Sequence, residues 1–180
     1  SRKEITKNLD TSKLLRMPWT NSDNAFSWLE ITRRCNLNCD YCYQKNRAHS
    51  DKDILKVETE LKTILRLRKC DTIFISGGEP LIHTQLEKIV RMVSSYRLKS
   101  MLVTNGHILD IDMVRKLKKA GLCGFILHVD RGQSRPGWTG KSEKELNKLR
   151  QEYADMIHSE KLICGFNTTI LPESLSEVAD

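Results

Sequence analysis

The sequence predicts an α/β fold in which parallel strands alternate with helices. Short runs rich in β-branched and aromatic residues recur along the chain, and stretches with apolar residues at a 3.6-residue period separate them. Strands that alternate with helices in this way are joined by right-handed crossovers, which produce a parallel sheet or a barrel. At 180 residues the chain is long enough for one compact domain with its own core.

Five strands are expected, and each is bounded by polar or turn-forming residues. They cover residues 27–31, 72–76, 100–104, 124–129 and 162–169. Residues 1–26 precede the first strand and are expected to form an irregular cap anchored by Trp19, with residues 27–180 as the core domain.

The helices between the strands are predicted from apolar periodicity and from capping residues. One face of the first helix is formed by Ile54, Val57, Leu61, Ile64 and Leu65. Capping-box spacing occurs at Thr84/Glu87, at Ser142/Glu145 and again at Ser174/Glu177, while Asp110 and Gly121 are placed to begin and end the third helix. The third capping box lies only three residues before Asp180, so we expect a chain truncated after strand five.

Composition narrows the class of protein. The apolar fraction of 39% and the charged fraction of 29% are ordinary for a soluble protein, and no run of 18 apolar residues predicts a membrane span. Residues 1–7 lack the apolar stretch of a signal peptide. Six cysteines with this background predict a cytoplasmic, metal-related protein rather than a disulfide scaffold, with Cys70, Cys123 and Cys164 packed in the core.

The net charge of +7 has two interpretations. Lys and Arg can simply solvate the outer faces of helices, or they can attract an acidic partner such as a nucleic acid or an acidic electron donor. The first interpretation is favoured because the basic residues are spread along the chain and are not interleaved with aromatic residues.

Three cysteines, Cys35, Cys39 and Cys42, follow the first strand within eight residues. Six cysteines scattered at random over 180 positions would give this spacing only about 0.006 times. A structural zinc site closes with four ligands, and iron–sulfur clusters are usually held by four thiolates, yet the next cysteine is Cys70. Three thiolates therefore predict a metal centre with one open position.

Polar residues follow every predicted strand. In parallel α/β folds the active site lies at the carboxyl ends of the strands. The ends carry the three-cysteine loop, Gly77-Gly78-Glu79-Pro80, Thr104-Asn105-Gly106, His128-Val129-Asp130 and Asn167-Thr168-Thr169. We expect one edge of one sheet to gather them, with the two glycines allowing a ligand to approach and Glu79 accepting from an ammonium group.

Individual residues at these ends allow both structural and functional roles. Tyr41 either packs in the core or contacts a cofactor ring, and His83 is expected to cap or solvate a helix rather than bind metal. His128 and Asp130 share one face of their strand, which makes them candidate catalytic residues. The loop 131–138 carries Arg131 and Arg135 and is either a substrate-contacting loop or an exposed connector.

Taken together, these motifs resemble the radical S-adenosylmethionine (radical SAM) superfamily. The resemblance rests on the Cys-x3-Cys-x2-Cys loop with an aromatic residue before its third cysteine, on Gly-Gly-Glu-Pro after strand two and on Thr-Asn-Gly after strand three. It covers about residues 26–170. The family implies a partial (βα)6 TIM-like barrel with a [4Fe–4S] cluster that cleaves S-adenosylmethionine reductively to a 5′-deoxyadenosyl radical, which abstracts hydrogen from a substrate.

The resemblance also implies roles for particular residues. Cys35, Cys39 and Cys42 would ligate three irons, and S-adenosylmethionine would chelate the fourth. Gly77, Gly78 and Glu79 would bind its methionine amino group, Tyr41 would meet the adenine, and Asn105 and Asn167 would contact the cofactor. His128 and Asp130 would be catalytic or substrate-contacting, and the substrate, a small molecule or a peptide, is not specified.

A second hypothesis is a zinc-dependent nucleic-acid-binding module with Cys35, Cys39, Cys42 and His49 as a closed site. The regular alternation of strands and helices disfavours it, so a nucleic acid partner is not expected. A membrane partner is not expected either, because no apolar run is long enough. An electron donor is expected instead: Arg33, Arg34, Lys45 and Arg47 flank the cysteine loop and are placed to dock an acidic flavodoxin or ferredoxin.

Overall fold

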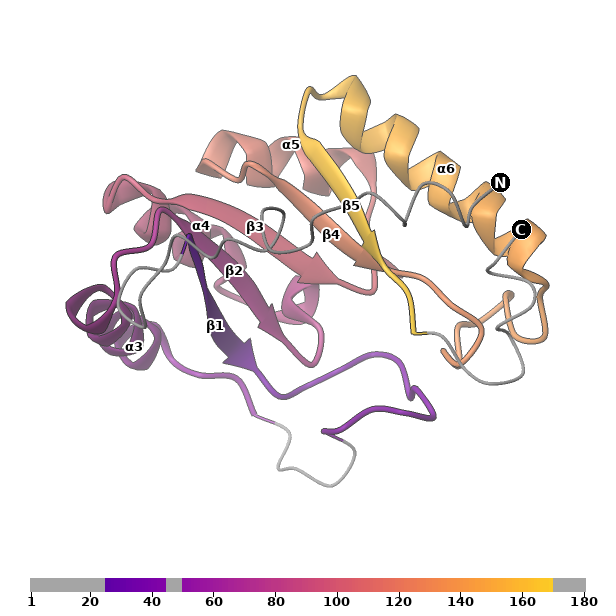
Figure 1. The fold of residues 1–180 in the computed structure, drawn as a ribbon, viewed down its shortest axis with the longest axis horizontal. Helices are drawn as coiled ribbons and strands as arrows, with labels where there is room; N and C mark the ends of the chain where they lie inside the picture. Colours follow the sequence, from indigo (N-terminus) through magenta and orange to yellow (C-terminus); the bar gives the residue numbers. More distant parts are fainter. Residues whose placement is uncertain (1–24, 45–49, 170–180) are drawn as a thin grey trace, which may run out of the picture.

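The computed structural model describes residues 25–44 and 50–169. These residues form one five-stranded parallel sheet in the order β1-β2-β3-β4-β5 (Figure 1). The strands are β1 (Phe26–Thr32), β2 (Thr72–Gly77), β3 (Lys99–Thr104), β4 (Gly124–His128) and β5 (Ile163–Asn167). The sheet is not closed into a barrel, because β1 and β5 are its two edges within the described residues.

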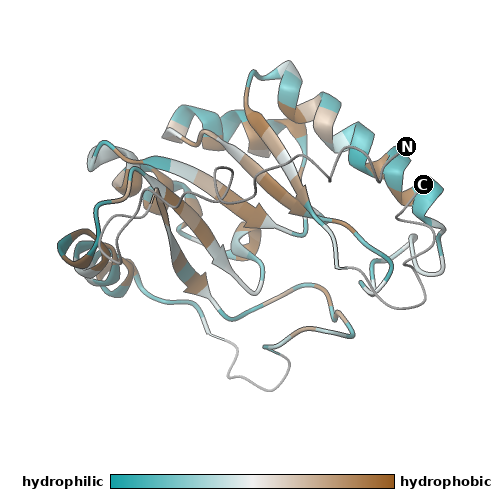
Figure 2. Ribbon diagram, viewed as in Figure 1, coloured by the Kyte–Doolittle hydropathy of each residue, from teal (hydrophilic) through white to brown (hydrophobic). Residues whose placement is uncertain are grey.

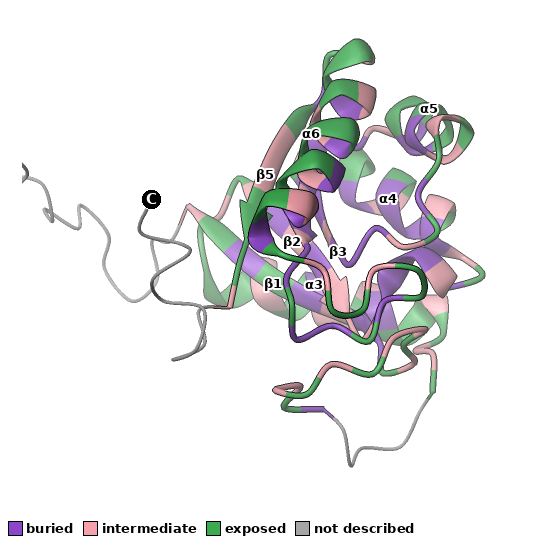
Figure 3. Cartoon of the chain, turned by 90° about the vertical axis from the view of Figure 1, so that its right-hand side faces the viewer, coloured by how far each residue is buried: buried purple, intermediate pink, exposed green. Residues whose placement is uncertain are grey.

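The helices connect successive strands, as the sequence predicts. They are α3 (Ile54–Leu67), the 3₁₀ turn η1 (Pro80–Ile82), α4 (Leu86–Ser95), α5 (Ile111–Ala120) and α6 (Glu143–Ser159). They cover one face of the sheet, and their buried sides point towards it (Figure 3). The predicted α/β fold with parallel strands is confirmed, and the observed strand bounds differ from those expected by one or two residues.

The core lies between the sheet and these helices. Alternating residues of the strands, such as Ile31 and Ile75, are fully buried against Val57 and Leu61 of α3. Figure 2 shows the apolar residues running along the strands. On the opposite face of the sheet, Phe74 packs against Phe26 and Trp28 with ring centroids 5.0 and 5.1 Å apart. Trp28 is 52% exposed, so this face is the more open one.

Three of the four predicted helix-end signals in the described part of the chain are correct. Ser142 forms a complete capping box with Glu145, whose pKa is lowered to about 2 by hydrogen bonds from the Ser142 backbone, Lys141 and the Ser142 hydroxyl. Asp110 Oδ1 accepts from Met113 N at 2.7 Å, and Gly121 ends α5 with a left-handed φ of 105°. The capping box at Ser174/Glu177 lies outside the described residues.

The capping box predicted at Thr84 is wrong by one residue. The N-cap of α4 is Gln85, and its own side chain makes no capping hydrogen bond. The reason is the preceding η1 turn, after which His83 performs the capping: its carbonyl accepts from Leu86 N at 3.1 Å and its Nδ1 from Gln85 N at 3.1 Å. His83 is therefore a buried capping residue and not a solvating one.

Three further expectations concern cysteines and membranes. All six cysteines are free; Cys70, Cys123 and Cys164 are all only partly buried, and Cys70 and Cys164 pack against the core whereas Cys123 does not belong to it. No helix among residues 25–44 and 50–169 is long and apolar enough to cross a membrane. The cap expected for residues 1–26, including Trp19, falls almost wholly outside the described residues, and Phe26 already belongs to β1.

The capping box of α6 leads to a prediction about stability. Ser142→Ala removes the hydroxyl that accepts from Glu145 N at 3.3 Å, which should lower the free energy of unfolding by about 1 kcal/mol. Ser159→Ala, which removes a hydroxyl that donates to Met156 O in the last turn of the same helix, should change it by less than about 0.5 kcal/mol. Denaturant unfolding followed by circular dichroism measures both, and equal effects would contradict the capping role.

Candidate cofactor site

The carboxyl ends of the strands meet along one edge, where the loop from β1 runs towards the loop that follows β4 (Figure 1). This edge holds the residues predicted as cluster ligands, cofactor contacts and catalytic residues. The three cysteines follow β1, Gly77-Gly78-Glu79 follow β2, and Asn105 follows β3. His128 ends β4, pairs in register with Asn167 of β5, and is two residues before Asp130. Asn167 is exposed.

The root of the cysteine loop packs directly on the glycine turn after β2. Gly78 N donates to Thr32 O at 2.9 Å, and Glu79 N donates to Arg34 O at 2.7 Å. A Cβ on Gly77 would lie 2.3 Å from Thr32 O, and one on Gly78 would lie 2.2 Å from Arg34 O. Both glycines are therefore required for the close approach of two backbones, a role that the sequence analysis did not assign to them.

The tip of the loop is fixed by the segment after β4. Cys39 and Gln133 form an antiparallel bridge, and Asp40 N donates to Gly132 O at 3.0 Å. The ring of Tyr41 lies on Gly132, where an added Cβ would be 2.0 Å from the ring. The cysteine loop is thus tied to β2 at its root and to the β4 loop at its tip.

Tyr41, Asp130 and His128 form one hydrogen-bonded network. The Tyr41 hydroxyl donates to Asp130 Oδ1, and His128 Nε2 lies 2.6 Å from Asp130 Oδ2. Thr169 N also donates to Oδ2, at 3.1 Å. Burial acts to raise the pKa of Asp130, but the hydrogen bonds from His128, Tyr41 and Thr169 outweigh it and lower that pKa. Burial, followed by the bond to Asp130, raises the pKa of Tyr41.

The part of the loop that follows Cys42 is held to β1. Gln44 Nε2 donates to Glu30 Oε2 at 2.9 Å, and Gln44 N lies 3.4 Å from Cys42 Sγ. Glu30 Oε1 also accepts from Arg33 Nε at 3.3 Å, and Lys52 Nζ lies 4.0 Å from the same oxygen. Arg34 pairs with Asp51 at 2.8 Å. The sequence analysis missed Glu30 and Gln44, because nothing in their local pattern shows that Gln44 folds back onto β1.

Glu79 is fully buried, and its carboxylate accepts three hydrogen bonds from the protein. The donors are Leu81 N at 2.8 Å, Thr104 Oγ1 at 2.6 Å and Asn105 N at 2.7 Å. Burial raises the pKa of Glu79, and these bonds partly offset the rise. The side chain therefore joins the turn after β2 to the end of β3, and its predicted contact with a ligand ammonium group stays a prediction.

Arg135 is a further residue of this edge, and it is only 2% exposed. Its Nη2 donates to Asn105 O and lies 3.4 Å from His128 O, and its Nη1 lies 3.4 Å from Tyr153 Oη. Sequence analysis placed Arg135 in a polar loop that was either substrate-contacting or exposed. The exposed alternative is wrong for this residue, because its guanidinium is enclosed by the ends of β3 and β4 and by α6.

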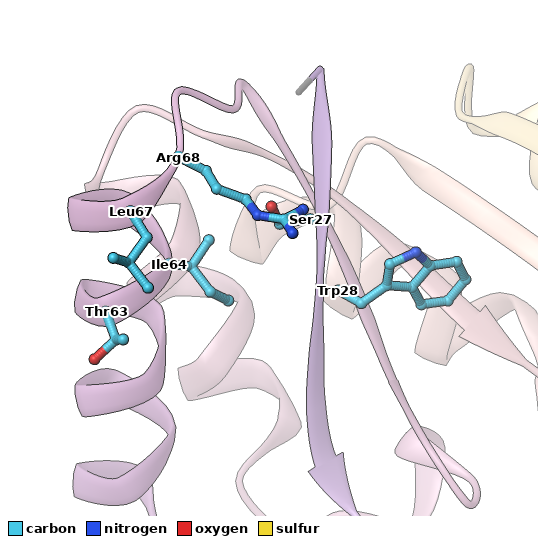
Figure 4. Close-up of a pocket in the computed structure, with 6 residues that line it drawn as sticks. All are labelled: Ser27, Trp28, Thr63, Ile64, Leu67 and Arg68. Atoms are coloured by element: carbon cyan, nitrogen blue, oxygen red, sulfur yellow. The ribbon is translucent and has the colours of Figure 1, made fainter. Parts of the chain in front are cut away.

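A hollow of about 380 Å³ lies elsewhere (Figure 4). It is lined by Ser27, Trp28, Thr63, Ile64, Leu67 and Arg68. Ser27 is near the amino end of β1, so this hollow is at the opposite end of the strand from the cysteines. The chemistry-bearing residues therefore mark the candidate site, and this hollow does not.

Comparison with known proteins decides the family. Residues 29–180 match the model of the radical SAM superfamily. The chain belongs to the radical SAM superfamily. It is 35% identical over 99 residues to a probable GTP 3′,8-cyclase of Methanococcus maripaludis, a match that covers 52% of this chain and 32% of the relative. It is 25% identical over 166 residues to an AdoMet-dependent heme synthase of Methanosarcina barkeri, covering 88% and 46%.

A solved structure shares the fold of this radical SAM chain. BtrN in complex with AdoMet and 2-DOIA has a TM-score of 0.54 and 22% identity, covering 79% of this chain and 56% of BtrN. The matched part of the chain spans about a third of the length of the cyclase and about half of the heme synthase. Radical SAM proteins use a [4Fe–4S] cluster and S-adenosylmethionine, so the predicted family and its cofactors are confirmed.

The residues present fit an iron–sulfur cluster. Three free thiols come from one loop, and burial together with the neighbouring Cys35 and Cys42 raises the pKa of Cys39 to about 11. Beside Cys35, the buried Nδ2 of Asn36 is a donor with no partner in the described part of the chain. Three thiols in one loop are the ligand type that iron–sulfur clusters take, and the spare N–H donor beside Cys35 suits an anionic group.

The close approach at Gly78 gives a prediction. In Gly78→Ala the new Cβ would press on Arg34 O, so the root of the cysteine loop must move, at a cost of about 1–3 kcal/mol. We expect lower stability and less iron per chain after anaerobic reconstitution. Gly165→Ala is the control, because its Cβ would meet only the end of the Ile126 side chain, at 2.9 Å. Wild-type iron content and stability in Gly78→Ala would contradict the packing argument.

Proposed function

We propose that this chain is the core of a radical SAM enzyme in which Cys35, Cys39 and Cys42 ligate three irons of the cluster. One observation carries the proposal: a loop with three free thiols is held at the carboxyl edge of the sheet by both β2 and the β4 loop. When bound, the cluster and S-adenosylmethionine supply reductive cleavage to a 5′-deoxyadenosyl radical that abstracts hydrogen from a substrate. The substrate is not identified.

We further propose that the remaining predicted residues surround the same cofactor. The Gly77-Gly78-Glu79 turn adjoins the root of the cysteine loop, so its backbone is placed to receive the methionine amino group. Asn105 follows β3 and Asn167 ends β5, on either side of β4, and both would contact the cofactor. Tyr41 would meet the adenine with its ring, while its hydroxyl stays on Asp130. His128 is the more exposed member of the pair with Asp130, at 31% against 2%, so it is better placed to contact a substrate.

The domain limits and the location remain proposals as well. Residues 27–180 would form the core domain, and residues 1–26 a separate cap. A cytoplasmic location is supported by six free thiols, since oxidising compartments favour disulfides.

Reconstitution tests the cluster ligands. Under anaerobic conditions the wild-type chain should bind about four irons and, with dithionite, convert S-adenosylmethionine to 5′-deoxyadenosine. Cys35→Ser, Cys39→Ser and Cys42→Ser should each lower the iron content and abolish this conversion. Cys70→Ser should keep the wild-type iron content and the conversion. A stoichiometric zinc content without cluster absorbance would instead support the zinc-binding hypothesis, whose fourth ligand, His49, lies outside the described residues.

We also propose that an acidic flavodoxin or ferredoxin docks beside the cysteine loop. Arg33 and Arg34 support this docking site, since their side chains are 42% and 43% exposed even though they pair with Glu30 and Asp51. Lys45 and Arg47, the other two predicted contacts, lie outside the described residues.

Charge reversal tests the docking site. Arg33→Glu with Arg34→Glu should slow reduction by flavodoxin about tenfold at low salt and weaken its salt dependence. Lys144→Glu with Lys148→Glu, the same charge change on the exposed face of α6, should leave the rate unchanged. Stopped-flow absorbance measures the rates, and reduction by dithionite verifies that the cluster is intact. Equal rates in all three proteins would remove the docking site from this loop.

A further inference from the structure

Asn105 is held by hydrogen bonds at every one of its polar groups. Its backbone N donates to Glu79 Oε2 at 2.7 Å, and its carbonyl accepts from Arg135 Nη2. Its side-chain Oδ1 accepts from His107 N at 2.8 Å, and its Nδ2 donates to Asn36 Oδ1 at 2.8 Å. The residue is 8% exposed. Its amide is therefore fixed both in position and in rotation.

The amide of Asn105 points its nitrogen at a predicted cluster ligand. Nδ2 lies 3.9 Å from Cys35 Sγ, a distance that a long N–H···S hydrogen bond can span. The backbone N–H of His107 can only donate, so the atom facing it must be the amide oxygen and the atom facing Cys35 must be the nitrogen. That nitrogen carries two hydrogens, of which Asn36 takes one. The second is directed at the sulfur.

Arg135 is a buried cation whose donors go to neutral acceptors. Within the described part of the chain no carboxylate lies within ion-pair distance of it, and its Nε has no partner. Its Nη2 also donates to Gln133 Oε1 at 3.1 Å, and Tyr153, which it contacts, donates to Gly106 O at 2.8 Å. Burying an Arg without an ion pair is costly, so the carbonyls that it binds must be held firmly for the arrangement to persist.

Glu79 and Arg135 therefore both hydrogen-bond to the backbone of Asn105. A buried anion receives its N–H, and a buried cation donates to its C=O. Each bond involves a charged group, and such bonds are about twice as strong as neutral ones. The positive charge of Arg135 also stabilises the ionised carboxylate of Glu79, because it acts to lower the pKa of Glu79 against the effect of burial. Moving Asn105 would break both bonds and separate the charges.

We propose that Asn105 donates an N–H···S hydrogen bond to Cys35 when that thiolate holds the cluster, and that Arg135 is a positioning residue for this bond. The proposal rests on the proposed function, in which Cys35 is a ligand. A donor at a ligand sulfur stabilises the reduced cluster, which carries one more negative charge, and so raises the reduction potential. Arg135 acts through the Asn105 carbonyl, which keeps the side-chain amide aimed at the sulfur.

Asn105→Asp removes the donor and also adds a negative charge, so Asn105→Ala, which only removes the donor, must lower the potential as well if the bond exists. The Asn105→Asp variant keeps an oxygen for His107 N but places a carboxylate oxygen in place of the amide nitrogen that faces Cys35. We expect the equilibrium constant for reduction of the cluster to fall about tenfold, which corresponds to a potential lower by about 59 mV for a one-electron couple. A redox titration followed by electron paramagnetic resonance measures it. Asn147→Asp, which adds the same charge on the exposed side of α6, should leave the potential unchanged.

A double-mutant cycle tests the role of Arg135. Arg135→Lys keeps the positive charge but loses the planar fork, so it should lower the reduction equilibrium about threefold if the guanidinium geometry orients Asn105. In the Asn105→Ala background, where there is no amide to orient, the same change should have no further effect. A shift of equal size in both backgrounds, or no shift in the wild-type background, would overturn the positioning role.

Iron content separates failure of this inference from failure of the proposed function. If the wild-type chain forms no cluster, or Cys35→Ser retains it, the assignment of Cys35 as a ligand is wrong. If both Asn105 variants load iron like wild type and their potentials coincide with it, only the N–H···S bond is refuted. If Asn105→Asp does not load, Asn105→Ala decides: the potential must still fall, because the donor is lost without an added charge.

Discussion

The buried carboxylate of Glu79 is the interaction on which the rest of the candidate site depends. Its two oxygens bind the η1 turn and the end of β3, while its backbone N binds the root of the cysteine loop. A carboxylate in this position would be costly without donors, and burial does raise its pKa. Its three donors come from the η1 turn and the end of β3, and its backbone N adds the cysteine loop, so three separate segments of the edge must stay in place together.

Close backbone contacts at glycines also position the cysteine loop. Gly77 and Gly78 admit the root of the cysteine loop, and Gly132 admits the ring of Tyr41 near its tip. The loop is therefore placed by the fold itself, at both ends of the three-cysteine segment. A site whose ligands are positioned by packing and by surrounding hydrogen bonds is preorganised for its cofactor.

The order of the elements was predictable because it depends on local patterns. Alternating apolar residues and helix periodicity identify the five strands and the helices between them, and Ser142 and Gly121 mark ends that the structure shows. The error at Thr84 has a local cause as well: the η1 turn and His83 replace the side-chain cap. The shared face of His128 and Asp130 also follows from strand geometry, and the two side chains do pair.

The sequence by itself determined the parallel α/β fold, the three-cysteine loop and the residues that follow each strand, since periodicity and spacing are properties of neighbouring residues. Only the tertiary structure decided that Tyr41 reaches Asp130, 89 positions away, and that Arg135 is buried against the carbonyl of Asn105. These contacts depend on how loops from different strands meet at one edge. No local pattern encodes that meeting, because loop backbones take their course from the packing around them.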